Sequence, residues 1–121
     1  MAWHTITEPF EGDVEQFEVA SMAPSQVLPV VPGTAMAPAF GHIFSGGYAA
    51  GYYGYKWAEV LEADAFSLFK EKGIFNREVS GSFRENILSK GGTEHPMELY
   101  VRFRGHKPET KALIEKMGLG K

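Results

Sequence analysis

The chain has 121 residues, a net charge of −3 at neutral pH and no cysteine. A chain of this length forms one domain or part of one, and its weak negative charge gives no reason to expect nucleic acid or an anionic membrane as a partner. The missing cysteines exclude disulfides and thiolate metal sites, so we expect a cytoplasmic location, and no apolar run approaches the ~20 residues of a membrane span.

The first part of the chain is predicted to be irregular with one short helix. Asp13 and Gln16 have the spacing of a capping box, which predicts a helix that ends before Pro24. Four prolines between residues 24 and 41 forbid a continuous helix and predict an extended connector. Because this connector is apolar (VLPVV, then AMAPAF), we expect it to be packed rather than solvated. The irregular segment as a whole is expected to cover residues 1–47.

Residues 41–57, GHIFSGGYAAGYYGYKW, are the most informative stretch of the chain. They hold five of the fourteen glycines and four of the five tyrosines, with His42 just upstream of the tyrosines. Glycine destabilises helices, so this cluster indicates a backbone that bends or admits something closely. A Gly-rich turn that directs a histidine and several phenols to one place is typical of a ligand-facing wall.

A long central helix is predicted from about Tyr48 to Lys72, with a length of ~37 Å at the standard rise. Tyr48, Tyr52 and Tyr55 have the spacing i, i+4 and i+7, so their hydroxyls would share one face of it. The spacing alone leaves open whether these tyrosines bind a ligand or are half-buried core residues that bond to main-chain carbonyls. The main apolar stripe of the helix is predicted to comprise Tyr53, Trp57, Val60, Leu61, Ala65, Leu68 and Phe69.

Three shorter helices are predicted after Lys72. Each has a start signal, either a capping box or a proline at the first turn, and a glycine as its stop signal. The predicted start and stop residues are Ser82 and Gly91, Pro96 and Gly105, and Pro108 and Gly118. No stretch alternates like a convincing strand. We therefore predict an all-α fold with an irregular Pro/Gly-rich entry, one long helix and short C-terminal helices over residues 48–121.

Several blocks of the chain, in this order, resemble a known family. They are MAWHT, GHIFSGGYAAGYYGYKWAEVLEADAF, GIFN, FRENILSKGG, HPMELYVRFRG and KP. Together they are similar to the C-terminal end of the thimet-oligopeptidase-like zinc peptidases, the group that includes oligopeptidase A and the bacterial peptidyl-dipeptidases. The match covers nearly the whole chain. The resemblance implies the C-terminal part of a helical zincin catalytic domain, whose active site lies deep in a channel between two domains.

The resemblance also implies a chemistry and a set of site residues. In this family two histidines of a His-Glu-x-x-His helix and a glutamate on a following helix hold a zinc ion, which activates water for attack on a peptide. Negative charge then collects on the carbonyl oxygen and needs hydrogen-bond donors. By resemblance, His42, Tyr48 and Tyr55 would contact the substrate backbone or the developing oxyanion. The substrate-binding positions implied in the same way are Gly46, Gly47 and Tyr52.

The chain departs from the family in one respect. Its four histidines include no pair at i, i+4, so the zinc-binding helix is absent from the sequence. We therefore expect the chain to be a C-terminal fragment whose upstream part holds the zinc, and to bind no cofactor and to be inactive by itself. The sequence does not decide between endopeptidase and dipeptidyl carboxypeptidase specificity, or between a genetic and an experimental truncation.

The other chemically notable residues have simpler interpretations. His4 and His106 flank breakers and are expected to be exposed loop residues, whereas His95, which precedes Pro96, is expected to start a helix. Lys56 is expected either to be structural or to hold a substrate carboxylate. The remaining charged residues are expected to be solvated or ion-paired: Glu59, Glu62, Asp64, Arg102 and Arg104.

Three functions stay open at this point. In the first, the chain is part of a zinc peptidase that cleaves short peptides and is inert by itself. In the second, it is a separately encoded subunit that restores activity by docking onto a zinc-bearing chain. In the third, it is a non-catalytic peptide-binding or interaction module. Since the apolar surface of residues 24–69 exceeds what an isolated domain normally exposes, we also expect the isolated chain to form a helical homodimer that buries the Trp57 side of the long helix.

Overall fold

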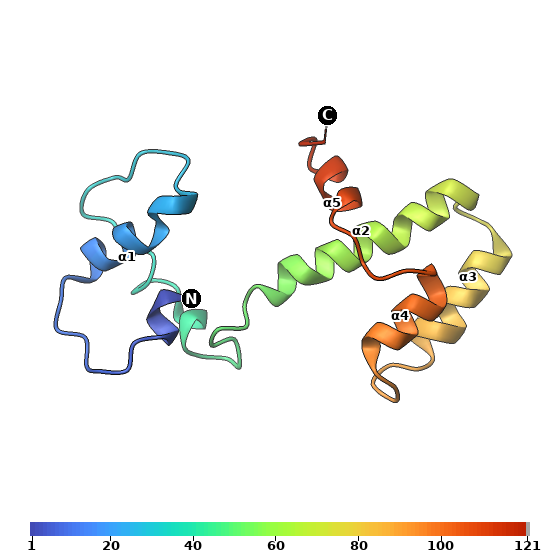
Figure 1. The fold of residues 1–121 in the computed structure, drawn as a ribbon, viewed down its shortest axis with the longest axis horizontal. Coiled ribbons are helices and arrows are strands. Elements are labelled where there is room, and N and C mark those ends of the chain that lie inside the picture. The colour runs from blue at the N-terminus through green and yellow to red at the C-terminus, as the bar shows by residue number, and fades with distance from the viewer. Residues whose placement is uncertain (121) are drawn as a thin grey trace. The chain divides into compact units, whose positions relative to one another are not determined.

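A computed structural model describes residues 1–120 of the chain (Figure 1). It divides into two compact units, Met1–Tyr53 and Gly54–Lys121. The described residues form α-helices, short 3₁₀ helices and turns without any strand, so the predicted all-α class is confirmed. None of the helices between residues 1 and 120 has the length and hydropathy that crossing a bilayer requires.

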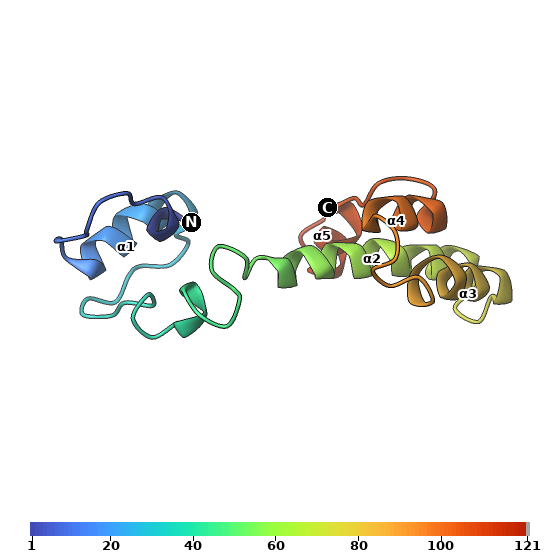
Figure 2. The same cartoon turned by 90° about the horizontal axis from the view of Figure 1, so that it is seen from below.

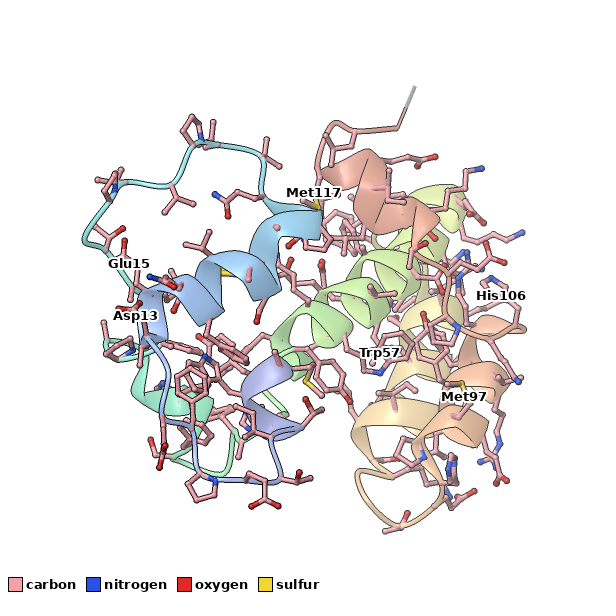
Figure 3. All side chains as sticks on the ribbon, turned by 60° about the vertical axis from the view of Figure 1, so that its left-hand side comes forward. Asp13, Glu15, Trp57, Met97, His106 and Met117 are labelled. Carbon is pink, nitrogen blue, oxygen red and sulfur yellow. The ribbon has the colours of Figure 1, made fainter. Side chains whose placement is uncertain are left out.

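The first unit contains one α-helix, α1 (Val14–Met22), and three 3₁₀ turns (Ala2–His4, Ala23–Ser25 and Gly41–Ile43). Asp13 caps α1 as predicted, because its side chain accepts a hydrogen bond of 2.8 Å from the backbone N–H of Gln16 (Figure 3). The ring of Trp3 packs on Phe17, with centroids 4.4 Å apart, and on Phe10, with centroids 5.1 Å apart. This aromatic contact attaches the N-terminal segment to the helix.

The proline-rich connector is held to α1 by two glutamates rather than by apolar packing. Glu18 accepts hydrogen bonds from the backbone N–H groups of Met36 and Ala37, at 2.7 and 2.6 Å, and Glu15 accepts one from Gly33 at 2.8 Å. The expected burial of the connector's apolar side chains is not found among the described residues, since Val27, for example, is 91% exposed. Carboxylates on one face of a helix therefore fix the path of this loop.

The second unit is built on the long helix α2, which spans Gly54–Lys72 (Figures 1 and 2). The predicted start at Tyr48 is wrong, because residues 49–53 form turns. Ala50 has φ = +53°, a value that no right-handed helix contains. The glycines that follow Tyr48 weaken helix propensity over the same stretch, so the helix begins only at Gly54. The predicted end at Lys72 is confirmed, and the next residue, Gly73, has the positive φ of +103° that is typical of a helix C-terminus.

Three further α-helices follow α2. α3 (Arg77–Phe83) continues into a π-helical turn, Arg84–Leu88, so the predicted start at Ser82 is wrong. The true N-cap is Asn76, whose side chain accepts hydrogen bonds from the N–H groups of Glu78 and Val79. The side chain of Asn76 thus accepts from backbone N–H groups that have no partner within the helix, and the helix starts six residues before the predicted capping box at Ser82.

The last two helices confirm one prediction and correct another. α4 (Pro96–Arg104) starts at its proline and ends at Gly105, which has φ = +88°. His95 is its N-cap, as expected, and its Nδ1 accepts a hydrogen bond of 3.3 Å from the N–H of Met97. α5 (Lys111–Lys116) begins three residues after the predicted Pro108.

The core of the second unit is small and lies along α2. Val60 and Ala63 of α2 pack on Leu113 of α5, and the other buried apolar residues come from α3 and α4: Val79, Leu99, Tyr100 and Phe103. Val60 thus belongs to the core as the predicted apolar stripe requires, whereas Trp57 at one end of that stripe is 44% exposed (Figure 3).

A buried polar network joins α2 to α4. The carboxylate of Asp64, which is only 3% exposed, accepts a hydrogen bond of 2.6 Å from the hydroxyl of Tyr100 and lies 3.7 Å from Nε of Arg104. Arg104 also donates to the backbone carbonyl of Asp64 and to the hydroxyl of Ser67. Burial, together with the hydrogen bond to Asp64, raises the pKa of the Tyr100 phenol above its usual value. Asp64, Tyr100 and Arg104 thus each have a hydrogen-bond partner, as buried polar groups require.

Candidate functional site

The Gly-rich segment folds back on itself at two glycines. After the 3₁₀ turn Gly41–Ile43, Gly46 and Gly47 take φ values of +69° and +75°, which side chains with a Cβ rarely adopt. Ser45 supports the turn, because both its backbone N–H and its hydroxyl donate to the carbonyl of Gly41. This reversal brings Tyr48 back over His42.

The reversal gathers four aromatic rings into one cluster. The ring of His42 lies 4.8 Å from that of Tyr48 and 5.6 Å from that of Tyr52, and the two tyrosine rings are 5.4 Å apart. Phe40 closes the cluster with an edge-to-face contact to Tyr52 at 4.7 Å. His42 and Tyr52 are exposed and Tyr48 is half-buried, so the cluster forms part of the surface of the first unit.

A strained residue lies beside this cluster. Ala50 is the one non-glycine residue with positive φ among residues 1–120, and its N–H donates a hydrogen bond of 3.3 Å to Nε2 of His4. Such backbone conformations persist only where surrounding contacts hold them, and they gather at functional sites. His4 is therefore a half-buried structural residue in a 3₁₀ turn, which corrects the prediction that it lies exposed in a loop.

The structure brings most of the predicted site residues together, by a route that the sequence analysis did not foresee. His42, Tyr48 and Tyr52 meet through turns, and a Cβ at Gly46 would lie 3.3 Å from the Tyr48 ring and 3.4 Å from the His42 ring. The predicted common helix face with Tyr55 is wrong, because α2 starts after Tyr52. Tyr55 lies on the first turn of α2 in the second unit and is 55% exposed.

Two neighbours of the cluster were missed as site-forming residues. Phe40 contacts both His42 and Tyr52, and the ring of His4 contacts Phe44 at 5.2 Å while its nitrogen holds the Ala50 turn. Phe40 precedes Gly41-His42 directly, so its position was a usable signal. The partner of His4 lies 46 residues away, and no local pattern reveals such a contact.

The cluster offers several hydrogen-bond donors, but His42 is its one usual metal ligand. Imidazole and phenol groups donate to carbonyl oxygens, and exposed aromatic rings contact a peptide backbone through their faces. Among residues 1–120 no three His, Asp or Glu side chains are arranged to hold a metal ion.

The charged residues outside the cluster pair as predicted. Lys56 binds Glu59 at 2.8 Å, Lys116 binds Glu62 at 2.6 Å and Arg102 binds Glu94 at 2.7 Å. Hydrogen bonds from Arg102 and Lys90 lower the pKa of Glu94, and Glu94 in turn raises the pKa of Arg102. His106 does lie in a loop, but it is half-buried rather than exposed.

Comparison with known proteins gives a consistent result. Oligopeptidase A of Escherichia coli K12 is 63% identical over 81 residues, which are 67% of this chain and 12% of that protein. Dipeptidyl carboxypeptidase of the same strain is 40% identical over 121 residues, which are 98% of this chain and 18% of that protein. The probable cytosolic oligopeptidase A of Arabidopsis thaliana is 46% identical over 99 residues, covering 78% of this chain and 14% of that protein.

The chain thus spans between 12% and 18% of the length of these relatives. The sequence model of peptidase family M3 matches residues 1–119, which include the histidine–tyrosine cluster and all five α-helices. On this match, the chain belongs to peptidase family M3.

Proposed function

We propose that the chain takes part in the zinc-dependent hydrolysis of short peptides, as the substrate-binding wall of an oligopeptidase or peptidyl-dipeptidase. The observation that carries this proposal is the meeting of His42, Tyr48 and Tyr52 around a glycine turn, in a chain that belongs to a peptidase family. A cytoplasmic location agrees with the absence of cysteine.

The proposed catalytic role rests on hydrogen-bond donation. A ring N–H of His42 and the hydroxyl of Tyr48 donate to the carbonyl oxygen of the scissile peptide, and Tyr55 joins them as a third donor when substrate is bound. The oxygen gains negative charge as the carbonyl carbon becomes tetrahedral. Donors that are already oriented stabilise that charge more than they stabilise the neutral substrate, which lowers the barrier.

The glycines and the second tyrosine have a binding role in this proposal. Gly46 and Gly47 lack side chains at the bend, so a peptide backbone approaches the turn closely. Tyr52 supports the His42 ring and offers its own ring face to the substrate. These three residues therefore set the distance between the peptide and the donors.

Zinc does not fit the residues that this chain supplies. The sequence has no His-Glu-x-x-His, and residues 1–120 contain no suitable group of three ligands. We propose that a further polypeptide segment supplies the zinc ligands and the attacking water, and that the chain has no peptidase activity by itself. Tight binding of one zinc equivalent by the purified chain, measured by mass spectrometry of the metal content, would contradict this part of the proposal.

A chimera tests the catalytic role directly. The 121 matched residues of E. coli dipeptidyl carboxypeptidase are replaced by this chain, and cleavage of a quenched fluorescent peptide is followed. Tyr48→Phe is expected to lower kcat by ~10²–10³ with little change in KM, because it removes a donor that acts mainly in the transition state. The matched control is Tyr53→Phe, the same change at a more exposed ring a few residues along, which should leave kcat unchanged.

The result also separates the proposal from its alternative. If Tyr48→Phe and Tyr53→Phe behave alike, the cluster is structural. If the chain binds peptides by itself but supports no hydrolysis in the chimera, it is a non-catalytic peptide-binding or subunit-interaction module.

A further inference from the structure

The turn that joins Tyr48 to Tyr52 has a conformation that its own residues disfavour. The N–H of Gly51 donates to the carbonyl of Tyr48 at 2.8 Å and closes this turn. Ala50 is the third residue of the turn and has φ = +53°. Turns with a positive φ at this position usually have Gly or Asn there, because a Cβ is strained in that conformation. A contact from outside the turn must therefore hold Ala50.

His4 supplies that contact. The N–H of Ala50 donates to Nε2 of His4 at 3.3 Å, although the two residues are 46 positions apart in the sequence. Both residues are half-buried, so water competes less for this hydrogen bond than it would at an exposed site. Since a neutral imidazole has one acceptor nitrogen, the proton of His4 lies on Nδ1. The hydrogen bond thus stabilises the conformation that the Cβ of Ala50 disfavours.

The ring of His4 also contacts the chain on the other side of the glycine bend. It packs edge-to-face on Phe44, with centroids 5.2 Å apart. His4 therefore holds both ends of residues 44–50, the segment that contains the Gly46–Gly47 bend and Tyr48. Two adjacent glycines give a backbone many conformations, and fixing both ends of the segment removes most of them.

His4 is in turn fixed to α1 through its neighbour. It ends the 3₁₀ turn Ala2–His4, in which its own N–H donates to the carbonyl of Met1 at 2.8 Å. Trp3 in the same turn packs on Phe17 of α1, with centroids 4.4 Å apart. A helix thus supports His4, and His4 supports the segment that carries Tyr48.

We propose that His4 is a positioning residue of the candidate site, and that it keeps the phenol of Tyr48 against His42 by accepting the hydrogen bond from Ala50. His4 acts through the turn and does not contact the peptide. This inference rests on the proposed function, in which Tyr48 donates to the peptide carbonyl, because a donor lowers the barrier only when it is already oriented. Without an acceptor at residue 4, Ala50 relaxes to a negative φ and the turn moves Tyr48 away from His42.

NMR of the purified chain tests this placement without reference to activity. In the wild type, nuclear Overhauser effects are expected between the rings of His42 and Tyr48, whose centroids lie 4.8 Å apart, and the nitrogen shifts of His4 should show the proton on Nδ1. His4→Phe keeps a ring beside Phe44 but has no acceptor, so the His42–Tyr48 effects should be lost. His4→Gln should keep them, because its side-chain oxygen can accept from Ala50.

Two comparisons separate positioning from a general loss of folding. The effects between Trp3 and Phe17 should persist in His4→Phe, since that contact does not involve the imidazole; if they are lost, His4→Leu replaces this variant. Adding Ala50→Gly to His4→Phe should restore the ring contacts of the site, because glycine adopts a positive φ without strain. Site contacts that survive in His4→Phe would overturn the inference. So would contacts that neither His4→Gln nor Ala50→Gly restores.

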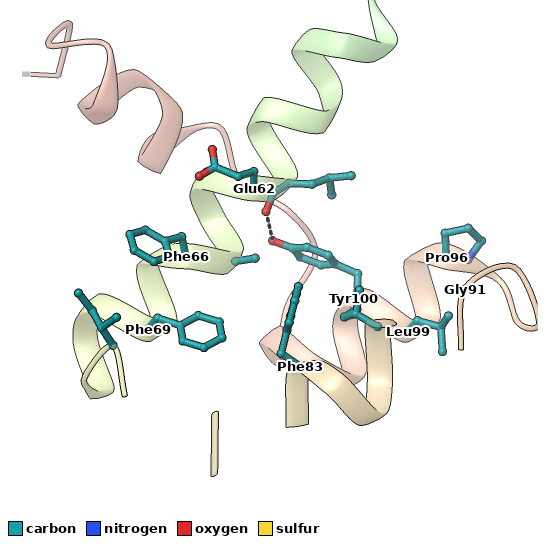
Figure 4. A pocket seen from close by; sticks show the side chains of 12 residues that line it. Glu62, Phe66, Phe69, Phe83, Gly91, Pro96, Leu99 and Tyr100 are labelled. Carbon is teal, nitrogen blue, oxygen red and sulfur yellow. Dashed lines mark hydrogen bonds between the residues drawn. The ribbon is translucent and has the colours of Figure 1, made fainter. Parts of the chain in front are cut away.

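The chimera with E. coli dipeptidyl carboxypeptidase gives the catalytic readout. His4→Phe should lower kcat about 10-fold or more with little change in KM, because a misplaced donor no longer stabilises the transition state. His4→Gln should recover most of this activity. The control is Tyr100→Phe, which removes a hydrogen bond in the second unit, where the Tyr100 hydroxyl lies 3.4 Å from the carbonyl oxygen of Leu61 (Figure 4); it should leave kcat unchanged.

The two experiments fail in distinguishable ways. If Tyr48→Phe leaves kcat of the chimera unchanged, the proposed function fails, and the ring contacts in the free chain still decide whether His4 places Tyr48. If His4→Phe lowers kcat no more than Tyr100→Phe does while Tyr48→Phe lowers it strongly, the proposed function stands and the role of His4 is overturned.

Discussion

The two units of this chain are stabilised in different ways. The first, residues 1–53, contains no buried residue, no lysine and no arginine, with five acidic side chains between residues 8 and 18. The second contains all twelve lysines and arginines of the chain, together with the six ion pairs and the whole buried core found among residues 1–120. Hydrogen bonds from the backbone to carboxylates and contacts between rings hold the first unit, whereas apolar burial holds the second. The candidate site thus lies on the unit with the less stable kind of support, as expected for regions that bind ligands.

One tryptophan in each unit makes this comparison measurable. Trp3 belongs to the first unit and Trp57 to the second, and the chain has no others. Variants that retain only one of them report the unfolding of one unit at a time. We expect the Trp3 signal to change at a lower urea concentration than the Trp57 signal.

The largest expected effect comes from the buried network of the second unit. Asp64→Ala removes the carboxylate that pairs with Tyr100 and Arg104, and should lower the free energy of unfolding by about 3–5 kcal/mol because a buried cation and hydroxyl lose their partner. Urea unfolding followed by Trp57 measures the loss. The Trp3 transition should stay where it is.

Tyr100→Phe serves as the control for this prediction. It removes one hydrogen bond but leaves the Asp64–Arg104 contact, so a smaller loss of about 1–2 kcal/mol is expected. If both variants cost the same, the arginine contact contributes nothing to stability.

Local and long-range features of the chain differ in how far they follow from the sequence. The caps at Asp13, Pro96 and Gly105 are set by neighbouring residues, so local patterns predict them correctly. The burial of Asp64 is not predictable in this way, because its partners Tyr100 and Arg104 are 36 and 40 residues away. Contacts across such distances decide which of several similar carboxylates is buried.

The candidate site shows the same division. The composition of residues 41–57 identifies His42, Tyr48 and Tyr52, since few structures need so many glycines and phenols together. Their arrangement cannot be predicted from the sequence, because the turn at Ala50 depends on a hydrogen bond from its N–H to the imidazole of the distant residue His4. The helical spacing of the tyrosines therefore predicted that Tyr48 and Tyr52 are neighbours, but for the wrong reason, and it wrongly grouped Tyr55 with them on one helix face.

An intermediate effect is expected from the carboxylate that holds the connector. Glu18→Ala removes two hydrogen bonds to the backbone of Met36 and Ala37, and should lower the stability of the first unit by about 2 kcal/mol, since both bonds are partly solvated. Unfolding followed by Trp3 measures the change.

Glu11→Ala is the matched control for Glu18→Ala, because Glu11 is an exposed glutamate in the same acidic stretch. A stability change within about 0.5 kcal/mol is expected for it. An equal effect of both substitutions would mean that net charge, rather than the hold on the connector, stabilises this unit.

The two glycines of the site turn, Gly46 and Gly47, differ in how closely other side chains approach them. Gly47→Ala introduces a Cβ at φ = +75° with no atom within 4 Å, so it should cost only the backbone strain of about 1–2 kcal/mol. Gly46→Ala adds the same strain and also brings its Cβ to 3.3 Å from Tyr48 and 3.4 Å from His42. Gly46→Ala should therefore be the more destabilising of the two by urea unfolding with Trp3 detection. Equal losses would show that the rings yield freely.

The smallest expected effect is a pH dependence on the surface of the second unit. Arg102 and Lys90 lower the pKa of Glu94 in the folded chain, so folding is favoured by the ionised carboxylate. This stabilisation is present above the unfolded pKa and is lost as the pH falls through the lower folded value. Glu94→Gln should remove that part of the acid dependence in Trp57-detected unfolding as the pH is lowered through the usual carboxylate pKa. Because Glu94 is partly exposed, 0.5 M salt should weaken the wild-type effect, while the buried Asp64 network should keep its contribution under the same conditions. A salt response that is as large for Asp64→Ala as for Glu94→Gln would show that burial in the second unit gives its polar contacts no protection from solvent.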